Sequence, residues 1–276
     1  MKNFLLLFIV STFLYTSYGQ SGNGFPHLQK QGTATQLVVH GKPFLILGGE
    51  LGNSTASNLD YLKPYWENLK KLNLNTILAP VYWELMEPAE GKFDFSLIDG
   101  LIKDARENNI KLVLLWFGSW KNSMSCYAPE WVKKDIERFP RALDINGMGK
   151  EILTSFSSNN LEADKKAFVM LMKHLKEIDS DNNTVIMVQV ENEIGMIPDA
   201  RDYYGKANEA FKSEVPAELT GYLKEHKENL IPEFLDYWKG NGYETSGTWE
   251  EIFGKSLKTD EVFMAWQYSK YVEEIT

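Results

Sequence analysis

Short, almost wholly apolar runs alternate along this chain with longer segments whose apolar residues recur every three or four positions. The apolar runs cover residues 45–50, 76–82, 111–117 and 184–190, and they predict buried strands. The periodic segments between them predict amphipathic helices. Their apolar positions are Leu62, Trp66, Leu69 and Leu72, then Leu97, Ile98, Leu101, Ile102 and Ala105, then Ala167, Phe168, Leu171, Met172, Leu175 and Ile178.

This alternation indicates an α/β fold in which helices cover a parallel sheet. Two architectures fit the pattern, an open doubly wound sheet and a closed (β/α)8 barrel. No glycine-rich phosphate loop follows the first strand, so a nucleotide-binding open sheet loses support. We therefore expect a (β/α)8 TIM barrel, preceded by a β-hairpin over residues 36–47 that turns at His40-Gly41.

After Gly195 the sequence becomes helical and polar, with scattered aromatic residues and no convincing fifth strand. A closed barrel needs eight strands, whereas residues 45–195 supply roughly four. We expect residues 20–276 to be the N-terminal part of a barrel-type catalytic domain, with residues 196–276 forming a helical segment.

Residues 1–19 have the layout of a secretory signal peptide. Lys2 precedes an apolar run over residues 4–14, and small or weakly polar residues follow up to Gly19. The run is too short to cross a bilayer, and no later stretch is apolar enough to do so. We expect a secreted or periplasmic protein whose mature chain begins at Gln20.

Composition narrows the range of partners. The formal net charge of -9 disfavours nucleic acids and anionic membranes, which require basic surfaces. The single cysteine, Cys126, excludes an internal disulfide. The four histidines are isolated and show no ligand spacing, so we expect neither a metal site nor a cofactor.

Each predicted strand ends in residues suited to a substrate site. In (β/α)8 barrels the carboxyl ends of the strands carry the reactive groups, because the βα loops converge there. Four strands with such ends favour a functional site, although any one residue taken alone is about as well explained by a structural role. The strand-end residues are Glu50 after the first strand, Tyr82, Trp83 and Glu84 after the second, Trp116, Trp120 and Asn122 after the third, and Glu191, Asn192 and Glu193 after the fourth.

At these strand ends the chain resembles the retaining glycosidases whose fourth strand ends in Asn-Glu. Residues 189–195 resemble the Q-x-E-N-E-(F/Y)-G signature of glycoside hydrolase family 35, the β-galactosidases. Residues 83–95 are similar to a stretch shared by families 35 and 42, W-x-x-x-E-P-x-x-G-x-(F/Y)-D-F. Residues 48–54 and 118–123 resemble a bacterial subgroup of family 35-type enzymes.

The resemblance implies that Glu193 is the general acid/base and that Asn192 holds the 2-hydroxyl of the sugar. Retaining hydrolysis needs two carboxyl groups about 5–5.5 Å apart, one as acid/base and one as nucleophile. In this clan the nucleophile sits on the seventh strand, so we expect it to be missing from this chain. We assign no nucleophile among the downstream glutamates Glu244, Glu250, Glu251, Glu261, Glu273 and Glu274.

Glu191 lies two residues before Glu193, so the two side chains point to the same side if the strand stays regular. We expect Glu191 to bind sugar or to raise the pKa of Glu193; the alternative is a satisfied salt bridge inside the barrel. The remaining candidate substrate-binding residues supply aromatic faces, a carboxylate and an amide, although Trp116 could equally fill the barrel interior. They are Glu50, Tyr82, Trp83, Trp116, Trp120 and Asn122.

The expected partner is an oligosaccharide or polysaccharide with terminal β-galactose. Two departures from the family 35 pattern bear on the sugar: Ile194 replaces the usual aromatic residue, and residues 181–184 replace Gly-Gly-Pro. A β-glucosidase-type specificity on the same barrel therefore stays open, as does a non-catalytic carbohydrate-binding protein or an inactive fragment.

Overall fold

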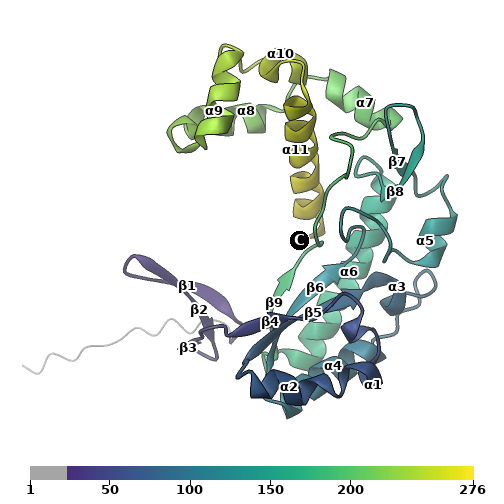
Figure 1. Cartoon of the computed structure of the whole chain (residues 1–276), viewed down its shortest axis with the longest axis vertical. Coiled ribbons are helices and arrows are strands. Elements are labelled where there is room, and N and C mark those ends of the chain that lie inside the picture. Colours follow the sequence, from purple (N-terminus) through teal and green to yellow (C-terminus); the bar gives the residue numbers. More distant parts are fainter. Residues whose placement is uncertain (1–23) are drawn as a thin grey trace, which may run out of the picture.

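A computed structural model describes residues 24–276, and the predicted signal peptide lies outside this range. Its centre is a four-stranded sheet in the order β4-β5-β6-β9, in which every neighbouring pair is parallel (Figure 1). This confirms the predicted parallel α/β architecture. The strands are β4 (Gly48–Glu50), β5 (Thr76–Tyr82), β6 (Lys111–Phe117) and β9 (Val185–Gln189).

Helices cover one face of this sheet. Alternate side chains of β5 and β6, such as Ile77 and Leu114, join the apolar stripes of α4 and α6 in one buried cluster. The first predicted helix is split in two near Pro64, because proline has no backbone N–H to continue the hydrogen-bond ladder. The helices are α1 (Leu59–Leu62), α2 (Tyr65–Lys71), α4 (Ser96–Glu107) and α6 (Ser158–Asp179), with η1 (Thr55–Ser57), α3 (Trp83–Met86) and α5 (Glu130–Lys134) in the connections.

The N-terminal hairpin packs against the other face of the sheet. Its turn at His40-Gly41 is confirmed, and both residues have the positive φ that a tight hairpin turn requires. Val39 lies in a small buried cluster with Val113 of β6 and Ile186 of β9. The hairpin has a third strand that we did not predict. The strands are β1 (His27–Gln31), β2 (Ala34–Val39) and β3 (Lys42–Pro43).

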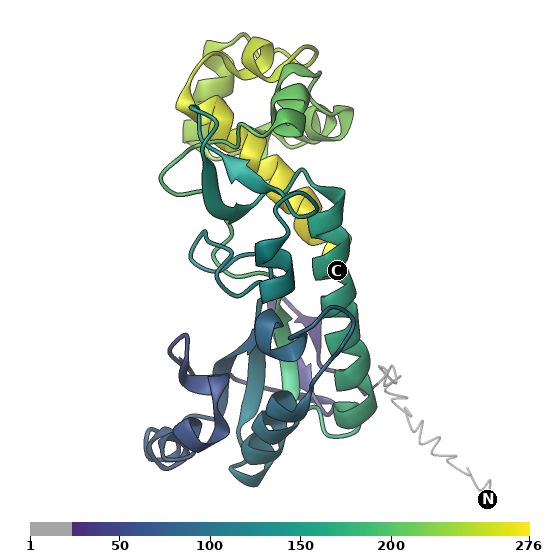
Figure 2. The same cartoon turned by 90° about the vertical axis from the view of Figure 1, so that its right-hand side faces the viewer.

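Beyond β9 the described chain is helical, as predicted, and contains no further strand up to Thr276. The helices form a separate lobe that extends away from the sheet, and α11 returns from this lobe to pack on α6 (Figure 2). None of the described helices combines the length and apolar character needed to span a bilayer. The helices are α7 (Gly205–Lys212), α8 (Ala217–Glu225), η2 (Lys227–Asn229), α9 (Pro232–Gly240), α10 (Trp249–Phe253) and α11 (Leu257–Ile275).

One small element lies between β6 and α6. It is an antiparallel pair, β7 (Arg141–Leu143) with β8 (Gly149–Leu153). Asp202, which follows β9, accepts hydrogen bonds from the Leu143 N–H and the Thr154 hydroxyl of this region. The pair therefore fixes the course of the chain as it leaves the end of β9.

Candidate active site

Three of the predicted site residues are exposed at the carboxyl ends of the strands. Glu50 ends β4, Asn122 lies in the loop after β6, and Glu193 follows β9. Because β4 and β9 are the outer strands, Glu50 and Glu193 stand at opposite edges of the sheet, with β5 and β6 between them. The three residues share one end of the sheet, and Asn122 and Glu193 lie on adjacent loops there.

Glu193 forms an ion pair with a lysine that we did not predict as a site residue. The Glu193 side chain is 57% exposed, and its Oε2 lies 2.5 Å from the Nζ of Lys121, whose side chain is 6% exposed. The backbones are also joined, since the Ser123 N–H donates to the Glu193 carbonyl oxygen at 2.9 Å. The predicted acid/base therefore has a cation beside it, and not the carboxylate that we expected.

Glu191 and Glu193 do not share one side of the strand, so that prediction was wrong. β9 ends at Gln189, and both glutamates have left-handed backbones, with φ of 60° and 50° respectively. This conformation breaks the alternation of a regular strand. As a result Glu191 turns into the protein, where it is 3% exposed, whereas Glu193 faces solvent.

Glu191 and Asp164 form a buried carboxyl pair. Glu191 accepts hydrogen bonds from the Trp120 N–H at 2.8 Å and from the Ser119 N–H at 3.3 Å. Asp164, on α6, accepts from the Trp116 indole N–H at 2.9 Å and from the same Ser119 N–H at 3.0 Å. The two carboxyls share the Ser119 N–H, and no Lys or Arg of the described chain forms an ion pair with Glu191, so the predicted alternative of a salt bridge was wrong. The pair anchors the loop after β6 to both β9 and α6.

This pair leaves no space beside it. A Cβ atom at Gly118 would lie 2.2 Å from the Trp116 Nε1 and 2.6 Å from the Glu191 Oε1. Both distances are far below van der Waals contact, so only glycine lets the backbone pass this close to the carboxyls.

Burial raises the pKa of Glu191 well above its usual range, and the neighbouring charge of Asp164 raises it further. A raised pKa in the folded state contributes stability below the unfolded-state value, near 4.5, and that stability is lost as the pH rises through the folded-state value. We therefore expect the contribution of Glu191 to the unfolding free energy to fall as the pH is raised above about 4.5.

The variant Glu191→Gln cannot ionise, and we expect it to gain stability relative to wild type as the pH rises. Chemical denaturation at a series of pH values measures both curves. Parallel curves for the two proteins would contradict the presence of a shared proton in this pair.

The three tryptophans predicted as sugar platforms are buried, and we correct that assignment. Trp83, Trp116 and Trp120 each have 0% exposure, so no ring face is open to a ligand. The indole N–H of Trp83 donates to the Glu87 carboxylate at 2.8 Å, and the ring packs edge-on against Trp131. Trp116 does not fill the barrel interior either, because it packs between β6 and α6, with its ring 5.9 Å from that of Phe168.

Trp120 shows why a loop tryptophan became part of the core. Two tyrosines of α11, Tyr268 and Tyr271, meet it edge-on at centroid distances of 5.5 and 4.7 Å. Helix α11 comes from far along the chain, so these contacts have no local sequence signal. Tyr82 is likewise buried, and its hydroxyl donates to the Asn53 carbonyl oxygen at 2.7 Å, which again leaves it unavailable to a sugar.

Asn122 is available for hydrogen bonding, whereas the side-chain oxygen of Asn192 is not. Asn192 is 6% exposed, and its Oδ1 is buried without a hydrogen-bond partner among the described residues. A buried acceptor without a partner is costly, and this side chain would have to turn outward before a ligand hydroxyl could reach it. Asn122 is exposed in a left-handed turn directly after Lys121.

Lys121 and Asp164 are the residues that our sequence reasoning missed. Asp164 had a detectable signal, because it occupies the apolar stripe of α6 together with Ala167, Phe168 and Leu171. A carboxylate at such a position predicts a buried partner. Lys121 had none, since its contact with Glu193 depends on the shape of two loops.

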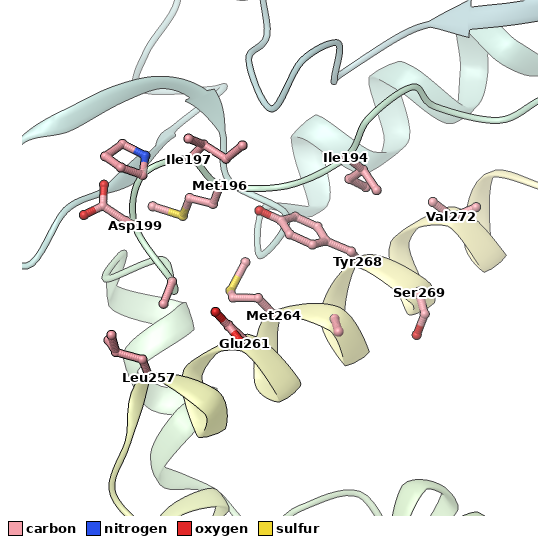
Figure 3. A pocket seen from close by; sticks show the side chains of 13 residues that line it. Ile194, Met196, Ile197, Asp199, Leu257, Glu261, Met264, Tyr268, Ser269 and Val272 are labelled. Carbon is pink, nitrogen blue, oxygen red and sulfur yellow. The ribbon is translucent and has the colours of Figure 1, made fainter. Parts of the chain in front are cut away.

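A groove of about 870 Å³ lies beside this site, between residues 194–200 and α11 (Figure 3). Ile194, Met196, Met264 and Tyr268 give it a largely apolar wall. Glu193 does not line it, so the groove and the predicted acid/base are separate features of the surface.

The structure gives no reason to assign a nucleophile among the six downstream glutamates. The six downstream glutamates lie on α10 and α11 or in the loop before α10, and all are exposed. Residues 24–276 also contain no group of three or more His, Cys, Asp or Glu side chains that could hold a metal ion.

A parallel sheet covered by helices, with carboxylates and amides at the strand ends, is the arrangement of barrel-type glycoside hydrolases. The chain belongs to the β-galactosidase family Glyco_hydro_42. The model of this family matches residues 59–256.

Curated relatives and solved structures agree with this family. The chain is 29% identical over 183 residues to "Beta-galactosidase" of Xanthomonas manihotis, covering 65% of this chain and 28% of that protein. It is 31% identical over 172 residues to "Beta-galactosidase 17" of Arabidopsis thaliana, covering 60% of this chain and 23% of that protein. It therefore spans only about a quarter of the length of these relatives.

The fold resembles that of Gan42B, a family 42 β-galactosidase from G. stearothermophilus solved as a catalytic mutant. The TM-score is 0.53 at 21% identity, over 83% of this chain and 33% of that one. A β-galactosidase from Rahnella sp. R3 gives a TM-score of 0.51 at 17% identity with the same coverage. These likenesses confirm part of a TIM barrel as the fold.

Proposed function

We propose that this chain carries the acid/base side of a retaining β-galactosidase site, with Glu193 as the acid/base residue. One observation carries the proposal: Asn192-Glu193 follows the fourth parallel strand of a sheet in a chain of the β-galactosidase family. The exposure of the Glu193 carboxylate supports the role, because a proton donor must reach the glycosidic oxygen of a bound sugar.

In the proposed reaction, Glu193 gives a proton to the leaving oxygen as the bond to the anomeric carbon breaks, and later takes a proton from the attacking water. The resemblance assigns the sugar 2-hydroxyl to Asn192, whose buried and unpartnered Oδ1 would have to turn toward the sugar to accept this hydrogen bond. Glu50 lies on β4, at the opposite edge of the sheet from β9. When a sheet curves into a barrel its two edges come to face each other, and Glu50 would then be suited to bind sugar hydroxyls near Glu193.

We infer that residues 24–276 do not supply the nucleophile. The six downstream glutamates are surface side chains of the helical lobe and of α11. Three of them form ion pairs: Glu250 with Lys255, Glu273 with Lys270 and Glu274 with Lys165. A nucleophile must lie about 5–5.5 Å from the acid/base carboxyl, and in this clan it comes from the seventh strand, which the described sheet does not include.

The assignments to family 35, to galactose as the terminal sugar and to export are supported by sequence. The family 35 assignment is supported by the resemblance of residues 189–195, whereas the matching profile is that of family 42. Galactose as the terminal sugar is supported by the names of the relatives. Export as a secreted or periplasmic protein is supported by the layout of residues 1–19, which lie outside the described range.

An external nucleophile tests the proposal on this chain. We expect the chain to convert an aryl β-galactoside to α-galactosyl azide when sodium azide is added, because azide replaces the missing carboxylate and inverts the anomeric carbon. The C–O bond breaks, a C–N bond forms, and the leaving oxygen takes its proton from Glu193. Nuclear magnetic resonance of the product identifies the anomer.

Two outcomes contradict parts of this proposal. Hydrolysis without azide that disappears when one of the six downstream glutamates is replaced would show that the nucleophile is present after all. Absence of both azide product and hydrolysis would remove the proposed activity and leave carbohydrate binding, which titration with methyl β-galactoside measures directly.

A further inference from the structure

Lys121 is a buried lysine with a carboxylate as its partner. Its side chain is 6% exposed, and its Nζ reaches Oε2 of Glu193 at 2.5 Å. The same ammonium lies 5.2 Å from the centroid of the Phe117 ring, in a position that favours a cation. A buried ammonium without a counter-charge is strongly unfavourable, so the ion pair fixes both side chains.

The backbone around Lys121 is held in one shape. The N–H of Lys121 donates to the Met124 carbonyl oxygen at 2.8 Å, and the Met124 N–H donates back to Lys121 at 3.0 Å. Between them, Asn122 and Ser123 have left-handed backbones with φ of 55° and 57°. This tight turn directs the lysine toward the end of β9.

The turn is also fastened to the segment that carries Glu193. Ser123 donates from its N–H to the Glu193 carbonyl oxygen at 2.9 Å and from its hydroxyl to the same oxygen at 3.3 Å. On the other side of Lys121, Glu191 accepts the N–H groups of Ser119 and Trp120. Lys121 therefore sits between two cross-links that join its loop to residues 191 and 193.

We propose that Lys121 is a positioning residue that orients the Glu193 carboxyl for proton transfer. This inference rests on the proposed role of Glu193 as the acid/base. Glu193 must first take up a proton from water, and Oε1, the oxygen that the ammonium does not engage, is the one that carries it to the glycosidic oxygen. The transfer leaves Glu193 as a carboxylate, which restores the ion pair with Lys121 and later takes a proton from the attacking water, while Lys121 keeps its charge throughout.

The test uses the full chain, azide, and two substrates that differ in their need for a proton. Phenyl β-galactoside has a poor leaving group and requires protonation, whereas 2,4-dinitrophenyl β-galactoside leaves readily without it. We expect Lys121→Met to lower the rate with the phenyl substrate about 10²-fold, the size of effect caused by misplacing a catalytic group. The dinitrophenyl rate should change little, and Lys121→Arg should restore part of the phenyl rate because it keeps the charge.

Lys103→Met is the matched control, since Lys103 forms an exposed pair with Glu107 on the outer helix α4. It should leave both rates unchanged. An equal loss on both substrates with Lys121→Met would show that the lysine only supports the fold, and this would overturn the inference.

The outcomes separate this inference from the proposed function. If Glu193→Ala shows the leaving-group dependence and Lys121→Met does not, Glu193 stands as the acid and the role of Lys121 is wrong. If Glu193→Ala shows no such dependence, or no azide product forms at all, both proposals fall.

The ion pair can also be observed directly through the 15N resonance of the Lys121 ammonium. We expect this resonance to persist in wild type and to be lost in Glu193→Gln. A resonance that is the same in both proteins would overturn the positioning role.

Discussion

Replacing Glu193 with alanine is expected to slow azide-dependent cleavage of phenyl β-galactoside by about 10²- to 10⁴-fold, the usual contribution of a general acid. The loss arises because the phenolate would have to leave without a proton. With 2,4-dinitrophenyl β-galactoside the same variant should retain most of its rate, since that leaving group is stable as an anion. Initial rates on both substrates measure the effect.

Glu107→Ala is the control, because Glu107 is an exposed carboxylate on α4, remote from the strand ends. It should match wild type on both substrates. If Glu193→Ala slowed both substrates equally, Glu193 would be a binding or structural residue and the acid/base would have to be sought elsewhere.

Replacing Asp164 with asparagine is expected to lower the unfolding free energy by about 2–4 kcal/mol, as removal of a partner from a buried network does. Asp164 accepts the Trp116 indole N–H and the Ser119 N–H on different oxygens. Asparagine has one oxygen, so its amide nitrogen would face one of these donors and leave it unsatisfied.

Glu191→Gln should cost much less than Asp164→Asn, at about 1 kcal/mol or below near neutral pH. The glutamine amide can donate to Asp164 while its oxygen accepts the Trp120 N–H. The long contact from the Ser119 N–H to Glu191 is lost, but this N–H keeps Asp164 as its acceptor at 3.0 Å. Urea denaturation at pH 7 measures both variants. Equal losses, or a larger loss for Glu191→Gln, would mean that Asp164 carries the shared proton.

The strands and helices could be predicted because each has a strong local pattern. β5 and β6 match the predicted limits residue for residue, since both are continuous apolar runs within one core. β1 was missed because all five of its residues are exposed, and its only support is pairing with β2. An exposed strand has no burial pattern to detect.

The candidate site was less predictable because its geometry depends on contacts between distant segments. Because Glu191 and Glu193 have positive φ, their side chains do not point to the same side, as they would in a regular strand. The tyrosines of α11 buried Trp120, about 150 residues away in the sequence. Residue types at strand ends indicate where chemistry can occur, but only packing determines which of them face solvent.

The outer edge of β9 shows how the sheet would continue into a barrel. β9 pairs with β6 on one side only, and no other described strand lies along its free edge. Met187 on this strand and Met172 on the adjacent α6 are 43% and 40% exposed, so the unpaired backbone is flanked by apolar side chains. In a closed barrel the next strand pairs with such an edge, so the free side of β9 marks where the remaining strands of the barrel would continue the sheet.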